Sequence, residues 1–302
     1  MLNKLATKFN STNSSTFSLL QRSKAQFTSM KRARNQSAQE LPEEFQQRHI
    51  EPFNKGCKLI LDIDPTLYDL IAKKDFSLFL KKEQTPMTLN HHFSKLASSI
   101  LAQQISGAAA NSIKQKVINR FNEFPTFQEM AKLYVDNRSQ ELRECGLSAR
   151  KVLYLESLSN YFNENQDSIE KLLTEDSDEI ASQLVANIKG IGPWSANMFL
   201  VTSMERMDIF AADDLGVARG CSKYLDSHPE ILKDIMSKRG PLIKRSKIKH
   251  VKKNWKIYDE DIVEKCGELF TPYRSIFMFL MWRLSETNVE VMEKREDEFV
   301  EK

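Results

Sequence analysis

Along most of this chain, apolar residues recur at intervals of three and four positions, which is the spacing of one face of an α-helix. Helices are expected to begin near residue 42 and after Asp64 and Asp214, and to cover residues 91–102, 107–121, 127–134, 141–145, 149–162, 180–188, 194–203, 258–270 and 274–284. Residues 41–90 lack the alternation of apolar and polar positions that is typical of strands. The pattern therefore predicts an all-α protein.

The clearest interruption of the helical pattern is the sequence Ile-Lys-Gly-Ile-Gly-Pro at residues 188–193. A leading helix is indicated by four apolar residues at helical spacing: Ile180, Leu184, Val185 and Ile188. Gly190 and Gly192 are expected to end that helix because glycine adopts positive φ without strain, and Pro193 suits the first position of the next one. The predicted helix, glycine hairpin and helix would direct backbone N–H groups outward to a phosphate, although an ordinary glycine-capped joint has the same pattern.

Composition restricts the possible classes of protein. The chain has 302 residues and is 41% hydrophobic, which is enough to bury the core of one large or two small domains. Its four cysteines are scattered without a C-x-x-C pair, a pattern typical of reduced intracellular thiols. No apolar run reaches the roughly eighteen residues of a membrane-spanning helix, so no membrane association is expected.

Basic residues are concentrated in two places, although the formal net charge is only +3. Residues 1–39 contain seven Lys or Arg and no Asp or Glu, and we expect residues 1–40 to form a disordered basic tail. That tail fits a mitochondrial transit peptide, while its Lys-Arg-Ala-Arg cluster at 31–34, just after Met30, fits a nuclear import signal or a DNA-contacting arm. Residues 237–256 contain nine Lys or Arg and no acid, which suits either a phosphate-contacting surface or a solvated loop.

Four further segments accompany the hairpin in a characteristic order: residues 100–107, 145–148, 207–216 and 272–279. Together they span the chain from roughly residue 45 to its C-terminus. The set resembles the helix-hairpin-helix DNA glycosylases, in which a Gly/Pro-rich hairpin is followed by a catalytic aspartate. Among these, it is most similar to the alkylation-repair 3-methyladenine DNA glycosylases, in particular the yeast type.

This resemblance implies two helical subdomains around an active-site cleft, with duplex DNA containing alkylated bases as the partner. One subdomain would comprise about residues 91–207, and the other about 41–90 together with 208–302. The closely spaced cysteines that hold an iron–sulfur cluster in some relatives are absent here, so no cofactor is expected. The resemblance further implies a monomer that acts in the nucleus, with mitochondrial targeting by the leader as the alternative.

The resemblance also assigns a catalytic residue. Hydrolysis of an N-glycosidic bond builds positive charge on the sugar, and a carboxylate near C1′ stabilises that charge. The family's aspartate lies two residues before a glycine, and Asp214 lies two residues before Gly216. The adjacent Asp213 is the alternative within the doublet. From its position alone, Asp214 is also expected to cap the helix that follows it.

The residue after Pro193 bears on both the reaction and the substrate. Relatives that also cleave the strand place there a lysine that forms a Schiff base with the sugar, whereas this chain has Trp194. A monofunctional glycosylase that leaves an abasic site is therefore expected. An indole face attracts positively charged purines such as 3-methyladenine and 7-methylguanine by about 0.5–2 kcal/mol, although a tryptophan after a hairpin is more often part of the core. The resemblance adds Trp282, Tyr273 and Met198 to this pocket.

The resemblance assigns DNA binding to two turns. The hairpin would bind a phosphate through its backbone amides, at Lys189, Gly190, Ile191 and Gly192. The turn after residue 102 would enter the minor groove with Gln103, Gln104 and Ser106. Some relatives fill the gap of the extruded nucleotide with a leucine where this chain has Gln104, and Ser106 is the alternative contact. A cation held by hairpin carbonyls is plausible, but no metal takes part in the expected chemistry.

Other polar residues are assigned no chemistry. Neighbouring His91 and His92 point to different faces of a helix without a carboxylate nearby, so no metal site is expected, and Lys151 is expected to be a solvated charge. Two alternatives to an alkylpurine DNA glycosylase remain. A non-catalytic protein that recognises damaged or branched DNA would need neither Asp214 nor the tryptophans, and a bifunctional oxidised-base glycosylase is disfavoured by Trp194.

Overall fold

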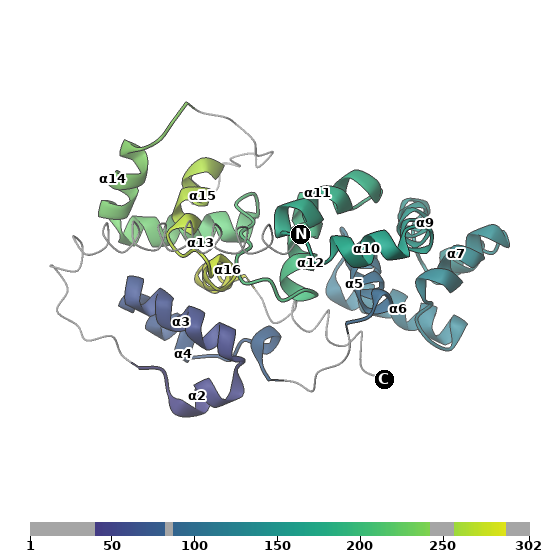
Figure 1. Cartoon of the computed structure of the whole chain (residues 1–302), viewed down its shortest axis with the longest axis horizontal. Helices are drawn as coiled ribbons and strands as arrows, with labels where there is room; N and C mark the ends of the chain where they lie inside the picture. Colours follow the sequence, from purple (N-terminus) through teal and green to yellow (C-terminus); the bar gives the residue numbers. More distant parts are fainter. Residues whose placement is uncertain (1–39, 82–86, 242–256, 288–302) are drawn as a thin grey trace, which may run out of the picture.

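The computed structural model describes residues 40–81, 87–241 and 257–287, and Figure 1 shows their arrangement. Within these ranges the regular structure is helical, and the β-type pairing there is a single isolated bridge between His49 and Leu80. The prediction of an all-α fold is therefore confirmed.

The helices form three consecutive groups in the sequence. The N-terminal group consists of α2 (Glu43–Arg48), α3 (Glu51–Ile63) and α4 (Tyr68–Ala72). The middle group consists of α5 (Leu89–Ala102), α6 (Gly107–Phe121), α7 (Phe127–Val135), α8 (Gln140–Glu144), α9 (Ala149–Glu164), α10 (Gln166–Leu172), α11 (Ser177–Asn187) and α12 (Pro193–Thr202). The C-terminal group consists of α13 (Leu215–Ser227), α14 (Pro229–Ser237), α15 (Glu260–Glu268) and α16 (Arg274–Leu284).

In space these groups make two helical subdomains. Figure 1 shows the purple helices α2–α4 beside the green and yellow helices α13–α16, with the teal and blue helices α5–α12 on the other side. The contacts agree, because α16 packs against α3, α4, α13 and α15, whereas α5 packs against α6, α7, α9 and α12. The exact residues at which one subdomain passes into the other stay a prediction.

Helix α16 is the centre of the C-terminal core. Every residue from Ser275 to Trp282 is buried, as expected for a helix that is apolar on all sides. Helix α13 approaches it closely at Gly220, where a Cβ atom would overlap the carbonyl group of Met281. This close approach matters for function because Asp214 is the N-cap of α13 and Trp282 belongs to α16.

Several helices begin where a short polar side chain accepts a hydrogen bond from an otherwise unpaired backbone N–H. Ser148 caps α9, Asp176 caps α11 and Asp214 caps α13 in this way. Thr126 and Glu129 form a reciprocal capping box at the start of α7. The expected capping role of Asp214 is therefore present in the structure.

Some sequence-based expectations lie outside the described residues. Residues 1–39 of the basic tail and residues 242–256 of the basic segment are among them. At the described edge of that segment, Arg239 pairs with Asp259 and Asp261, in each case at 2.6 Å. The four cysteines are all buried free thiols, and none of the helices in the described part of the chain is long and apolar enough to span a bilayer.

Candidate active site

The hairpin between α11 and α12 has the predicted form. The amide of Ile191 donates to the carbonyl of Ile188 at 3.2 Å, and both isoleucine side chains are buried, so the turn is anchored by its apolar residues. Gly190 has a φ of 87°, a left-handed conformation that favours glycine. Lys189 is exposed on the hairpin surface, and its backbone amide donates to Ser157 Oγ at 3.0 Å.

Two expectations about this hairpin are wrong in detail. Gly192 does not have positive φ but is extended, with φ −106° and ψ 176°, and it forms the N-cap of α12. Apart from its chain neighbours, no atom of the described residues lies within 4 Å of the position where its Cβ would be, so this residue leaves the outer surface open for another molecule. Val185 does not belong to the buried face with Ile180, Leu184 and Ile188, because it is 36% exposed.

A second turn, residues 103–106 between α5 and α6, lies beside the hairpin. Gln103 Nε2 donates to the carbonyl of Gly190 at 2.8 Å, which joins the two turns. Gln104 is exposed and has a φ of 59°, an uncommon conformation for a residue with a side chain. Ser106 caps α6 by accepting from the amide of Ala109 at 3.3 Å. Among the three predicted DNA contacts of this turn, Gln104 is thus the one whose side chain neither caps a helix nor joins the two turns in the described part of the chain.

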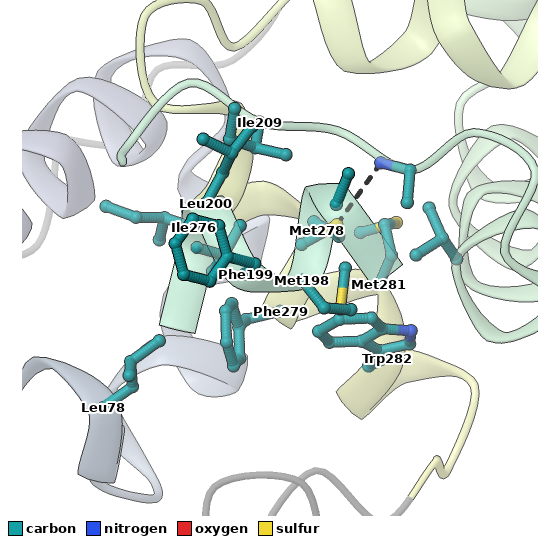
Figure 2. Packing of buried hydrophobic residues seen from close by; sticks show 14 of the residues in the cluster. Leu78, Met198, Phe199, Leu200, Ile209, Ile276, Met278, Phe279, Met281 and Trp282 are labelled. Atoms are coloured by element: carbon teal, nitrogen blue, oxygen red, sulfur yellow. Dashed lines mark hydrogen bonds between the residues drawn. The ribbon is translucent and has the colours of Figure 1, made fainter. Parts of the chain in front are cut away.

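The loop that leads to Asp214 is tied to the start of α16. Ser275 accepts from the amide of Ile209 at 2.9 Å through its hydroxyl and donates that hydroxyl to the carbonyl of Arg206 at 2.7 Å. Arg274 pairs with Asp208 at 2.7 Å. Figure 2 shows a further contact, in which the amide of Ala211 points at the sulfur of Met278, 3.4 Å away. The backbone before Asp214 is therefore fixed by the buried helix.

Asp214 itself accepts three N–H hydrogen bonds. Its Oδ1 accepts from the amide of Val217 at 2.8 Å and from Trp282 Nε1 at 2.8 Å, while its Oδ2 accepts from Trp194 Nε1 at 3.0 Å. The two indoles come from different helices, α16 and α12, and hold the carboxylate between them. Asp213, by contrast, is exposed. The two members of the doublet therefore differ in their surroundings: Asp214 is held by two indoles, and Asp213 faces solvent.

Gly216 allows this arrangement. A Cβ atom at this position would lie 2.8 Å from Cδ1 of Trp282 and 3.1 Å from Oδ1 of Asp214. Any side chain here would displace the indole from the carboxylate. The spacing of aspartate and glycine in the sequence thus has a direct packing reason.

A cavity of about 500 Å³ opens between the two subdomains. Its walls include Trp194, Met198 and Trp282, which the sequence predicted, and Gln103 and Gln104 of the turn. Several further lining residues were not predicted: Leu78, Ser98, Tyr154, Val201 and Phe279. Figure 2 shows Trp282, Met198 and Phe279 close together, with Leu78 beyond them. The wall is therefore aromatic and apolar, with a few polar groups.

Tyr273 is placed elsewhere and does not line this cavity. It forms the N-cap of α16, and its ring packs on α3, where a Cβ atom at Gly56 would lie 2.6 Å from Cδ1 of the ring. Its predicted part in the pocket has no support in this geometry. The aromatic residues of α16 that line the cavity are Trp282 and Phe279, and Phe279 lies six residues after Tyr273.

Two basic groups near the site are buried, and one of them, Lys151, differs from expectation. Lys151 is not solvated: it is 9% exposed, and its Nζ donates to the carbonyl of Leu101 at 2.6 Å. His92 is buried, its Nδ1 lies 3.1 Å from Ser203 Oγ, and burial, aided by the neighbouring His91, lowers the pKa of His92 to about 4. Within the described ranges, no cluster of three or more His, Cys, Asp or Glu side chains could hold a metal ion.

The sequence and the fold are both similar to those of known proteins. The protein-family model described as HhH-GPD superfamily base excision DNA repair protein matches residues 97–242 of this chain. The chain is 50% identical over 264 residues to DNA-3-methyladenine glycosylase of Saccharomyces cerevisiae, which covers 86% of this chain and 89% of that protein. It is 33% identical over 145 residues to DNA-3-methyladenine glycosylase 1 of Schizosaccharomyces pombe, covering 46% of this chain and 60% of that protein.

Among solved structures, the chain is similar to DNA-3-methyladenine glycosidase from Bacillus halodurans. The TM-score is 0.56 at 23% sequence identity, and the match covers 82% of this chain and 98% of that one. At this identity, the similarity concerns the fold alone. The stronger finding is the 50% identity to the S. cerevisiae enzyme, which extends over most of both chains. The chain therefore belongs to the HhH-GPD superfamily of base excision DNA repair proteins and, within it, to the family of DNA glycosylases that includes the S. cerevisiae enzyme.

Proposed function

We propose that this protein is a monofunctional DNA glycosylase that hydrolyses the N-glycosidic bond of alkylated purines, such as 3-methyladenine and 7-methylguanine, in duplex DNA. The observation that carries this proposal is the carboxylate of Asp214, held by two indole N–H groups beside an aromatic cavity. The names of the relatives in two yeasts support the substrate class. A protein that only bound DNA would need neither the carboxylate nor its donors.

The chemical role of Asp214 follows from its orientation. Departure of the base leaves positive charge on the sugar, and a fixed carboxylate beside C1′ stabilises that charge without having to reorganise. Among the described residues, the side-chain bonds of Asp214 place two donors on Oδ1 and one on Oδ2. Oδ2 therefore keeps capacity to orient the attacking water.

The cavity explains why a positively charged purine would be preferred. A flipped base would lie against the indoles of Trp194 and Trp282, and an aromatic face attracts a cation by about 0.5–2 kcal/mol. The positive charge on the base also makes it a good leaving group, so a strong general acid is not required. Extrusion costs a few kcal/mol and costs least for weakly paired lesions, which adds to selectivity.

The absence of strand cleavage is inferred from the position of the amines. Trp194 stands where bifunctional relatives have a lysine, and the residues that line the cavity in the described part of the chain include no lysine. Lys151 is engaged with the carbonyl of Leu101. Without an amine that reaches C1′, no Schiff base forms, and the product is an intact strand with an abasic site.

DNA would be held by the two turns. The open surface at Gly192 and the N-terminus of α12 would receive a phosphate, and the exposed Gln104 would fill the space left by the extruded nucleotide. Gln103 and Ser106 would support this turn from within. Action as a monomer is part of this proposal, and activity on DNA favours the nucleus as its location.

The first experiment compares the wild type with Asp214→Asn on duplex DNA that contains 7-methylguanine or 3-methyladenine. The wild type is expected to release free base and to leave a strand that breaks only after alkali. The variant keeps the shape of the side chain but loses its charge and one of the two oxygens that accept N–H bonds, so base release should fall by at least about a thousandfold. Binding of the same duplex, measured by fluorescence anisotropy, should remain.

Three other results would contradict the proposal. Strand scission before alkali would indicate a lyase amine. Tight binding without base release from any alkylated purine would favour the binding protein. If Asp214→Asn had wild-type activity and Asp213→Asn were inactive, the catalytic residue would be Asp213.

A further inference from the structure

Helix α9 lies directly behind the two DNA-facing turns. Three of its side chains, Lys151, Tyr154 and Ser157, occupy successive turns of the helix and contact groups in or next to these turns. We refer to them as the α9 face. None of them was expected from the sequence to bear on function.

Lys151 contacts the end of α5. Its ammonium group is buried and donates to the carbonyl of Leu101 at 2.6 Å, two residues before Gln103. The last carbonyls of a helix lack partners within the helix and carry its partial negative charge, so a cation is favoured there. Lys151 therefore terminates α5 at the point where the turn begins.

The other two residues of the α9 face, Tyr154 and Ser157, contact the hairpin. Ser157 Oγ accepts from the amide of Lys189 at 3.0 Å. The ring of Tyr154 packs so closely on Gly190 that a Cβ atom there would overlap it. Because Gln103 Nε2 donates to the carbonyl of Gly190, the α9 face, the end of α5 and the hairpin form one closed set of contacts.

The burial of a charge at this place needs a reason. Burial lowers the pKa of Lys151, because the ammonium form loses hydration, and no carboxylate compensates it in the contacts of the described residues. A methionine would fill a similar volume without that penalty. What the ammonium adds is a directed bond to one carbonyl, and hence a defined end for α5.

We propose that Lys151 is a positioning residue that fixes the turn at residues 103–106 relative to the hairpin, so that the duplex is penetrated at a set distance from the phosphate that the hairpin holds. This inference rests on the proposed function. It assigns Lys151 no contact with the substrate. Its loss should impair extrusion of the base and therefore the rate of base release, but not the binding of undamaged DNA.

The test uses Lys151→Met in the full-length protein. Single-turnover base release is expected to fall about tenfold to a hundredfold, as for other misplacements of about 1 Å. Affinity for an undamaged duplex should change by less than about threefold, because the hairpin and its N–H groups remain. A 2-aminopurine placed next to the lesion, whose fluorescence reports unstacking, should brighten less than with the wild type.

A matched control separates this role from general stability. Lys114→Met also removes a buried lysine, which belongs to α6 and whose Nζ lies 5.6 Å from the centre of the Phe124 ring. It should alter the melting temperature without altering the rate or the fluorescence. Lys151→Arg, which keeps a charged donor, should retain more activity than Lys151→Met.

The outcomes are distinct. Equal rates and equal 2-aminopurine signals for Lys151→Met and the wild type would overturn the inference. If Lys151→Met does not fold, Ser157→Ala removes the acceptor of the Lys189 amide and should lower the rate in the same direction, and an unchanged rate would overturn the inference. If the wild type releases no base at all, the proposed function fails, whereas the fluorescence change on an abasic-analogue duplex still tests Lys151.

Discussion

The loop that delivers Asp214 and the two turns that face DNA are held in opposite ways. The loop is bonded along its length to α16, through Arg274, Ser275 and the sulfur of Met278, all on a buried helix. In the described part of the chain, the turns are held on their inner side, by α9, by Gln103 and by the buried isoleucines of the hairpin. Their outer side is open, as shown by the empty space around Gly192 and the exposed side chain of Gln104.

This difference corresponds to the two tasks. A carboxylate that stabilises a developing charge must be placed to within a fraction of an ångström, and burial with many bonds achieves this. Groups that bind a phosphate or fill a base stack must be accessible, so their positions are set by supports on the inner side. Trp194 and Trp282 connect the two regions, because they belong to different subdomains and bind the same carboxylate.

The largest effect is expected from a pair of matched substitutions in the hairpin. Gly190→Ala places a Cβ at a φ of 87° and against the ring of Tyr154, and should lower the free energy of unfolding by about 2–4 kcal/mol. In Gly192→Ala the added methyl group has open space among the described residues, and the extended backbone there suits any residue, so stability should change little. Its methyl group would instead obstruct the phosphate, and DNA affinity should fall. Chemical denaturation and anisotropy measure the two quantities.

If Gly192→Ala leaves DNA affinity unchanged, the outer side of the hairpin is not the phosphate site. If Gly190→Ala melts like the wild type, Tyr154 moves away readily and the support from α9 is looser than the contacts indicate. Both results would weaken the contrast between inner support and outer access.

A smaller effect is expected when either of the two indoles that donate to the Asp214 carboxylate is replaced. Trp194→Phe removes one N–H donor to Asp214 Oδ2 and keeps an aromatic wall, so single-turnover base release should fall about tenfold to a hundredfold, the usual value of a hydrogen bond to a charged group. Trp282→Phe removes a donor to Oδ1 and should also lower stability, because this indole is 1% exposed. Equal activity of Trp194→Phe and the wild type would mean that α16 alone positions the carboxylate.

Much of the fold was predictable because it depends on local patterns. Helical periodicity located most of the helices, although not α10 and α14, and the glycines and Pro193 located the hairpin. The identity of Asp214 followed from a recurring sequence motif. Two further errors, the burial of Val185 and the φ of Gly192, arise because periodicity and glycine content do not specify how deeply a helix is buried or which glycine has positive φ.

The supports of the site were not predictable in this way. The bonds from the two indoles depend on how α12 and α16 meet across the cavity, which no local pattern contains. Lys151 was expected in solvent because lysine is almost never fully buried without a partner, and its partner is a backbone carbonyl in another helix. Tyr273 was assigned to the pocket by resemblance, but the turn of α16 directs Phe279 there instead.

The smallest effect concerns the cavity wall itself. Ser98 is 3% exposed and lines the cavity, and its hydroxyl oxygen has no hydrogen-bond partner among the described residues. The comparison is with Ser159 of α9, which is also buried but donates to the carbonyl of Glu156 at 3.1 Å. Removing an unpartnered hydroxyl costs little, so Ser98→Ala should keep or slightly raise the melting temperature, whereas Ser159→Ala should lower stability by about 1 kcal/mol.

The rates of base release by Ser98→Ala then test whether the Ser98 hydroxyl contacts the substrate. If it bonds an extruded base, Ser98→Ala should slow the release of some purines by about two- to tenfold and leave others unchanged, according to the acceptors that each base presents to it. Ser159→Ala should change no substrate preference. The measurement is the ratio of single-turnover rates for 3-methyladenine and 7-methylguanine. A ratio that stays constant in Ser98→Ala would mean that the wall selects by shape and charge alone, and that polar precision in this enzyme is confined to the carboxylate side of the cavity.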